Sequence, residues 1–169
     1  PKVAERSTGE VMGESAEKMA RIHGITREAQ DEFSVRSHHR AASAWSQGVF
    51  ENEVSPVTIK DLVVERDTIV RADTNLEKMA RPGSAFAKDG TLTAANSSTL
   101  TDGASATLIM SEERARALGY TPLAGFRSWA YRGVDPSDQV LKGPALSMPA
   151  ALERAGMELA DVDMVDMHE

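Results

Sequence analysis

Hydrophobic positions in the first part of the chain recur at helical spacing. The spacing predicts a helix over Met12–His23 that Gly24 ends in the left-handed conformation. A second helix is predicted over residues 27–47, with Thr26 as its N-cap and Gly48 at its end. The two helices would form an antiparallel pair joined by a short turn.

Short β-branched or alternating runs predict strands in five places. In chain order these are residues 53–59, 62–70, 91–95, 123–131 and 162–167. The first two are placed at a sheet edge, because Pro56 cannot donate a ladder hydrogen bond. The turn signal Lys88-Asp89-Gly90 precedes the third.

Capping residues and small residues predict four shorter helices. Ser111 would cap the third of them, and Gly156 would close the last. The four are residues 73–80 with Asp73 or Thr74 as cap, 104–110 packed in the interior, 111–119, and a helix opened by Ser147 and Pro149. The pattern therefore predicts a mixed α/β fold, rich in helix before about Gly90 and in sheet after it.

Composition and charge limit the classes of protein to which the chain could belong. The 169 residues carry 19 Lys and Arg against 26 Asp and Glu, a net charge of −7, which disfavours a nucleic-acid binder. No apolar run reaches the ~20 residues of a membrane-spanning helix, and no signal peptide is evident, so a cytoplasmic location is expected. We interpret the chain, which starts at Pro1 and stops after a predicted strand, as an internal piece of a longer protein.

Cysteine is absent from the sequence. These residues therefore supply no disulfide, no cysteine metal ligand and no cysteine nucleophile. The four histidines lack clustered carboxylates, so no metal site is predicted.

Three segments are candidates for chemistry. Residues 93–104 are mostly small or hydroxylated, which would let a ligand approach the backbone, although composition alone favours a tight strand-to-helix turn capped by Asp102. His168, just past a predicted strand, could donate a hydrogen bond or move a proton, or could simply be a polar strand end. The basic cluster at residues 36–40 could face phosphate, but a solvated helix face is favoured.

Four segments, in order, resemble the middle of a thiolase (3-ketoacyl-CoA thiolase, acetyl-CoA acyltransferase). They are Met-Gly-Glu-Ser-Ala-Glu at 12–17, Gly-Ile-Thr-Arg-Glu-Ala-Gln-Asp-Glu-Phe at 24–33, residues 91–106 around Asp-Gly-Ala-Ser, and Gly-Pro-Ala at 143–145 leading to His168-Glu169. The sequence of residues 93–105 resembles the degradative branch of the family, near the β-subunits of fatty-acid trifunctional complexes. So does His168, at a position where most thiolases carry Asn.

The resemblance implies an α/β fold of thiolase type, a layered αβαβα arrangement of two similar halves with an inserted loop domain. By this resemblance residues 1–88 are the loop domain, residues 89–119 end the first half, and residues 120–169 begin the second half.

The resemblance also implies an acyltransferase that cleaves 3-ketoacyl-CoA with free CoA in fatty-acid β-oxidation. CoA would be a substrate, and no cofactor is expected. Two cysteines do the chemistry in the family, so the isolated chain would be inactive. The family is usually oligomeric, and this branch often pairs with a hydratase/dehydrogenase subunit.

The roles of individual residues given below are implied only by this resemblance. His168 would help to form an oxyanion hole, Arg71 would lie near the nucleotide end of CoA, and Ser98 would bond the pantetheine arm. The apolar wall of the CoA tunnel would comprise Met12, Phe86, Ala94 and Leu100. Two alternatives stay open: a non-catalytic CoA-binding or interaction module, and a biosynthetic or sterol-carrier-type thiolase.

Overall fold

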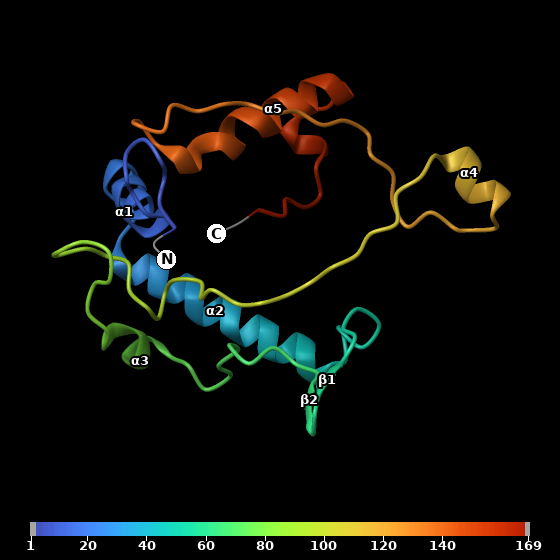
Figure 1. Ribbon diagram of the computed structural model, residues 1–169. Coiled ribbons are helices and arrows are strands. Elements are labelled where there is room, and N and C mark those ends of the chain that lie inside the picture. Colours follow the sequence, from blue (N-terminus) through green and yellow to red (C-terminus); the bar gives the residue numbers. More distant parts are fainter. Residues whose placement is uncertain (1–2, 168–169) are drawn as a thin grey trace. The chain divides into compact units, whose positions relative to one another are not determined.

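The computed structural model describes residues 3–167 and divides into two compact units, residues 1–100 and 101–169. In order, the elements are α1 (Met12–His23), α2 (Arg27–Ser46), β1 (Val57–Ile59), β2 (Leu62–Val64), α3 (Leu76–Ala80), α4 (Glu112–Ala117), η1 (Val140–Lys142), α5 (Gly143–Ala155) and η2 (Leu159–Asp161) (Figure 1).

The two long helices of the first unit begin and end where capping chemistry predicts. Gly24 follows α1 with a φ of 63°, so its backbone turns left-handed and stops the helix. The Thr26 hydroxyl accepts a hydrogen bond from the Ala29 amide at 3.2 Å and caps α2. The expected antiparallel pairing of these helices is wrong, since among the described elements α2 packs against α3 instead.

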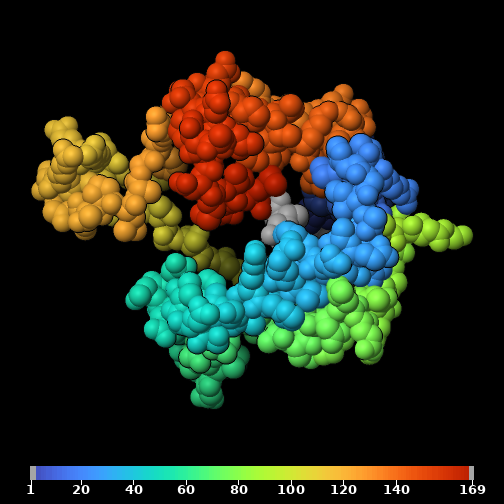
Figure 2. Space-filling view, turned by 180° about the vertical axis from the view of Figure 1, so that it is seen from behind, coloured from blue at the N-terminus to red at the C-terminus, as the bar shows by residue number. Residues whose placement is uncertain are grey.

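A short hairpin follows α2. β1 and β2 pair antiparallel, with Val57 opposite Val64, and Lys60 in the turn has a φ of 55°. Figure 2 shows this hairpin projecting from the surface. Its strands are shorter than expected, and its large apolar side chains are exposed: Val57, Ile59, Leu62, Val63 and Val64.

The interior of the first unit is unusually polar. Ala20 and Met79 are its buried apolar side chains among the described residues. Beside them five polar or charged residues are buried: Ser15, Glu17, Asp31, Thr74 and Thr93. Hydrogen bonds must therefore hold much of this unit together, because a buried polar group without a partner costs stability.

The second unit is built around α5, which runs from Gly143 to Ala155 and ends at Gly156 with a φ of 64°. Ser128 Oγ donates to the Ala151 carbonyl at 2.6 Å, so the chain before α5 lies along this helix. Ser111 caps α4 as predicted, through a bond from the Arg114 amide at 3.2 Å.

Several predicted elements are wrong. Residues 104–110 form no helix and are largely exposed, so no helix follows Asp102 for it to cap. Residues 123–131 and 162–167 form no strand, and residues 91–95 contribute one bridge, between Ser84 and Thr93. A strand exists only where another backbone pairs with it. Within residues 3–167 the segments 123–131 and 162–167 find no such partner, and residues 91–95 find one at a single position.

Two predicted helix starts are also wrong. The N-cap of α3 is Asn75, whose side chain accepts from the Lys78 amide at 2.9 Å, and not Asp73 or Thr74. α5 begins before Ser147, with a proline in its first turn, and Pro149 lies inside the helix.

Candidate functional site

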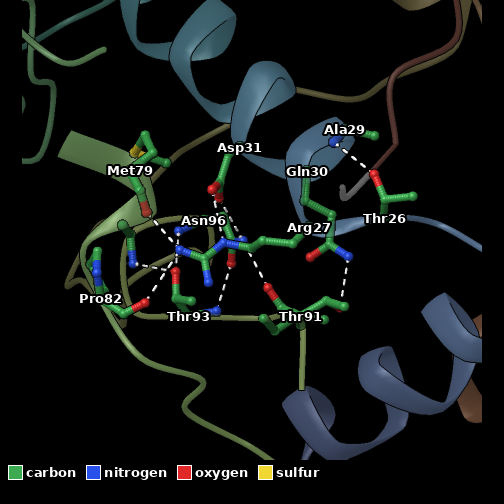
Figure 3. A network of polar contacts seen from close by, with 12 residues as sticks. Thr26, Arg27, Ala29, Gln30, Asp31, Met79, Pro82, Thr91, Thr93 and Asn96 are labelled. Atoms are coloured by element: carbon green, nitrogen blue, oxygen red, sulfur yellow. Dashed lines mark hydrogen bonds and ion pairs between the residues drawn. The ribbon is translucent and has the colours of Figure 1, made fainter. Parts of the chain in front are cut away.

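The loop formed by residues 91–96 is held by polar side chains of α2 (Figure 3). Asn96 Nδ2 donates to Asp31 Oδ1 at 2.9 Å, and Gln30 Nε2 donates to Thr91 Oγ1 at 2.8 Å. Asp31 is only 4% exposed and Thr93 is fully buried. In the low dielectric of such a site, hydrogen bonds to a charged group are strong and geometrically demanding.

Asp31 is paired with a cation that reaches two further segments. Arg27 Nε lies 2.8 Å from Asp31 Oδ2, one helical turn away on α2. The same guanidinium donates through Nη2 to the Met79 carbonyl at 2.6 Å and to the Pro82 carbonyl at 3.2 Å. Because Arg presents several donors in a rigid fork, this one side chain joins α2, the end of α3 and the Pro-Gly loop.

The Asn96 side chain closes the 91–96 loop on itself. Its Oδ1 accepts from the Thr93 amide at 2.7 Å, and its Nδ2 also donates to the Thr91 carbonyl at 3.1 Å. Thr93 Oγ1 in turn accepts from the amides of Ala95 and Asn96 at 3.2 and 3.3 Å. The loop is thus fixed up to Asn96, and Ser98 follows two residues later as an exposed side chain.

Glu17 holds the same loop from α1. Its carboxylate, on a residue 3% exposed, accepts from the Leu92 amide and lies 3.5 Å from Thr91 Oγ1. A Cβ on Gly90 would lie 2.6 Å from Glu17 Oε1, so a side chain at this position would push against the carboxylate that holds the loop. Two acidic side chains from two helices therefore set the position of one loop.

The predicted apolar wall is partly assembled. Gly13 leaves space for the Phe86 ring, and a hollow of about 320 Å³ opens beside this ring. Met12, the residue before Gly13, is 47% exposed. The Ala85 amide donates to the Leu92 carbonyl at 2.9 Å, so the segment carrying Phe86 runs antiparallel to the segment carrying Ala94. Leu100 is 98% exposed and touches little of this wall.

Two histidines farther along α2 hold the segment of residues 71–74. The backbone amide of Arg71 donates to His38 Nδ1 at 3.2 Å, and His39 Nε2 donates to the carbonyl of the buried Thr74 at 2.9 Å. Partial burial, and then the charges of Arg71 and His39, hold the pKa of His38 below its ordinary value of 6.5. The basic cluster at residues 36–40 is therefore more than a solvated face, since two of its members anchor the 71–74 segment.

These contacts anchor two segments of the candidate site at different positions along α2. His38 follows Asp31 by seven residues, which is about 10 Å of α-helix. The segment carrying Arg71 and the loop preceding Ser98 are therefore anchored about two turns apart on α2.

Other expectations concern residues or sites beyond this cluster. His168 lies outside the described residues. Across residues 3–167 no His, Asp and Glu side chains gather in threes as a metal site would require. In the same range no helix is long and apolar enough to cross a membrane.

The sequence analysis missed the residues that anchor the loop. The sequence patterns assign no anchoring role to Arg27, Asp31, Glu17 or Asn96. A signal existed: Glu17 stands three residues before Ala20, on the predicted apolar face of α1, where an unpartnered charge would be costly. Arg27 and Asp31 have the i,i+4 spacing of a helical ion pair.

Family models match nearly the whole chain. Residues 1–113 match the model described as thiolase, N-terminal domain, and residues 120–169 match the thiolase C-terminal domain.

Curated relatives agree with these models. The chain is 49% identical to a 3-ketoacyl-CoA thiolase of Erwinia tasmaniensis over 172 aligned residues, and 50% identical to one of Escherichia coli O157:H7 over 173. Each alignment covers all of this chain and 39% of the relative, so the chain spans about two fifths of their length.

Solved structures show the same fold. The Bacillus anthracis acetyl-CoA acetyltransferase superposes with a TM-score of 0.90 at 38% identity, over 96% of this chain and 42% of that one. Human mitochondrial 3-ketoacyl-CoA thiolase, solved in complex with CoA, gives 0.89 at 34% identity, over 96% and 41%. The expectation of a thiolase-type fold is confirmed, and the chain belongs to the thiolase family.

Proposed function

We propose that this chain forms the CoA-holding part of a thiolase that exchanges acyl groups between 3-ketoacyl-CoA and CoA. The proposal is supported by relatives named 3-ketoacyl-CoA thiolase that align with every part of the chain. In the net reaction a 3-ketoacyl-CoA and free CoA give acetyl-CoA and a shortened acyl-CoA.

The observation that carries the proposal is the spacing of two anchored segments along α2. Arg71, held at His38, supplies a cation for the phosphate or adenine end of CoA. Ser98, just past the loop held at Asp31, supplies a hydroxyl for the amides of the pantetheine arm. Met12, Phe86 and the segment of Ala94 supply apolar surface for the rest of the arm.

The chemical step needs groups beyond this cluster. A thiolate must take the acyl group, and the sequence contains no cysteine, so the thiolate comes from outside these residues. By family resemblance His168 would supply a donor to the carbonyl oxygen as negative charge develops on it. The chain alone should therefore show no turnover of acetoacetyl-CoA with CoA, followed by thioester absorbance.

Calorimetric titration of the chain with CoA tests the binding role. We expect saturable binding with a Kd below about 1 mM. Arg71→Ala and Ser98→Ala should each weaken it about fivefold or more, the loss expected for one hydrogen bond or charge contact. Arg6→Ala and Ser137→Ala make the same chemical changes at exposed positions outside the cluster and should leave the Kd unchanged. Absence of saturable binding would contradict the role.

A second candidate is a CoA-binding module that takes no part in catalysis. The specific observation that favours it is the absence of cysteine from the sequence. The two candidates predict the same CoA binding. They differ in whether the chain works inside a protein that supplies the thiolate.

Branch and assembly are finer proposals. We infer the degradative branch of β-oxidation, a homo-oligomer, and association with a hydratase/dehydrogenase subunit, from the resemblance of residues 93–105 and of His168. Activity confined to acetoacetyl-CoA in the intact enzyme would count against this branch.

A further inference from the structure

Asn96 has a hydrogen-bonding role that few side chains could fill. Both hydrogens of its amide are used, one on Asp31 Oδ1 and one on the Thr91 carbonyl, while its oxygen accepts from the Thr93 amide. A carboxylate has no donor, and a hydroxyl has only one. The site therefore requires two donors and an acceptor in one planar group.

The network that Asn96 completes ends just before Ser98. In the part of the chain that the structure describes, no hydrogen bond of residues 97–100 fixes their path, and Ser97 Oγ is buried without a partner. The direction in which the chain leaves Asn96 is thus set by the Asp31 contact on one side and the Thr93 contact on the other. Among the described residues, these contacts of Asn96 are the last hydrogen-bonded anchor before Ser98.

We infer that Asn96 and Asp31 are positioning residues that set the place of the Ser98 hydroxyl for the pantetheine arm of CoA. The inference rests on the proposed function, because Ser98 needs a defined position only if a ligand meets it. Arg27 fixes Asp31 in turn, since its guanidinium occupies the second carboxylate oxygen. A displacement of about 1 Å in residues that support a binding group is enough to impair binding geometry.

The variant Asn96→Asp tests the inference with little change of shape. It removes both donors and sets a second carboxylate against Asp31. The other charged groups around this position are Arg27 on α2 and Glu17 on α1. At pH 8 we expect the Kd for CoA to rise at least tenfold, and the amides of Ala95 and Asn96 to lose protection from exchange.

A pH profile separates a positioning role from general damage. Two carboxylates in contact share a proton at a raised pKa, and the protonated one can donate to the other. Relative to the unchanged chain at each pH, Asn96→Asp should regain most of its affinity and protection at pH 5.5. Asn75→Asp is the matched control, because it makes the same charge change at an exposed N-cap that aspartate also fills. Its affinity and protection, relative to the unchanged chain, should be the same at pH 5.5 and pH 8.

A reciprocal variant covers the case in which Asn96→Asp does not fold. Asp31→Asn with Asn96→Asp keeps the net charge and restores an N–H···O contact between the two positions. At pH 8 it should recover at least half of the lost affinity on a logarithmic scale. A double variant as weak as the single one would overturn the inference.

The remaining outcomes separate the two proposals. If the unchanged chain binds CoA and Asn96→Asp binds it equally well at pH 8, the positioning role is overturned and the proposed function stands. If the unchanged chain binds no CoA, the proposed function is overturned. Amide exchange then tests only whether Asn96 and Asp31 anchor the loop before Ser98: equal protection in both chains at every pH overturns this anchoring, and loss at pH 8 with recovery at pH 5.5 supports it.

Discussion

Gly13, in the first turn of α1, stands where any side chain would meet the ring of Phe86. A Cβ at this position would lie 2.2 Å from Phe86 Cδ1. Glycine to alanine in a helix ordinarily stabilises by about 1 kcal/mol, because glycine loses more backbone entropy on folding. Here we expect the opposite sign: Gly13→Ala should lower the free energy of unfolding in urea by about 1–3 kcal/mol through overpacking.

Two controls accompany this prediction. Gly83→Ala adds the same group where nothing lies within 4 Å, so it should change stability little. Combining Gly13→Ala with Phe86→Ala should cost less than the sum of the two single changes, because the clash is gone. A stabilising Gly13→Ala would show that the ring does not pack on α1.

His38 links the anchoring of Arg71 to pH. Its Nδ1 accepts a hydrogen bond only when deprotonated, and burial and nearby positive charge lower its pKa in the folded chain. The folded state then binds fewer protons than the unfolded state. The stability from this group is therefore present above pH 6.5, and is lost as the pH falls below 6.5 through the lowered pKa.

NMR titration of the histidine rings measures this directly. We expect a midpoint for His38 below 6.5, and a change in the Arg71 amide resonance at the same pH. His38→Gln removes the titrating group and should abolish that change. A His38 midpoint at or above 6.5 would contradict the contact.

At the scale of elements, the N-cap of α2 contributes to the free energy of unfolding. The Thr26 hydroxyl satisfies the Ala29 amide, one of the donors that a helix start leaves free. Thr26→Ala should lower the free energy of unfolding by about 1 kcal/mol, and Thr26→Ser, which keeps the oxygen, should stay close to the unchanged chain. Equal losses in the two variants would point to the lost methyl group instead.

Helices could be predicted because their ends depend on local residues. Gly24, Thr26, Ser111 and Gly156 act within a few residues of the backbone groups that they satisfy. Asn75 was missed because three neighbouring polar residues can all serve as caps, and tertiary contacts choose among them.

Elements built from short apolar runs could not be predicted in the same way. A short apolar run such as residues 104–110 has no period that separates a strand from a buried helix, and its state depends on backbone far away in the chain. Here Leu108 is 73% exposed, and the segment is neither helix nor strand.

At the scale of the whole molecule, the second unit leaves large apolar side chains in solvent. Leu123, Phe126 and Tyr131 are exposed on a segment whose backbone pairs with no strand in the described residues. Unpaired backbone and exposed apolar patches favour association. We expect sedimentation velocity to show association that grows with concentration, and Phe126→Lys to weaken it. A monodisperse monomer with a cooperative melt would contradict this.

The candidate site was only partly accessible from the sequence. Family resemblance pointed to the side chains that would meet CoA, such as Arg71 and Ser98. The groups that hold them, Asp31, Asn96 and His38, act through contacts between residues 33 to 65 positions apart, which no local pattern reveals. The boundaries at residues 88 and 119 stay predictions.

The central claim is that this chain holds CoA within a thiolase. The direct test replaces the matching stretch of the Escherichia coli O157:H7 3-ketoacyl-CoA thiolase, 50% identical to this chain, and measures turnover of a 3-ketoacyl-CoA. We expect the chimaera to keep kcat within about tenfold, and Ser98→Ala in it to raise the KM for CoA far more than it lowers kcat. A folded chimaera without turnover, or a KM for CoA that Ser98→Ala leaves unchanged, would contradict the claim.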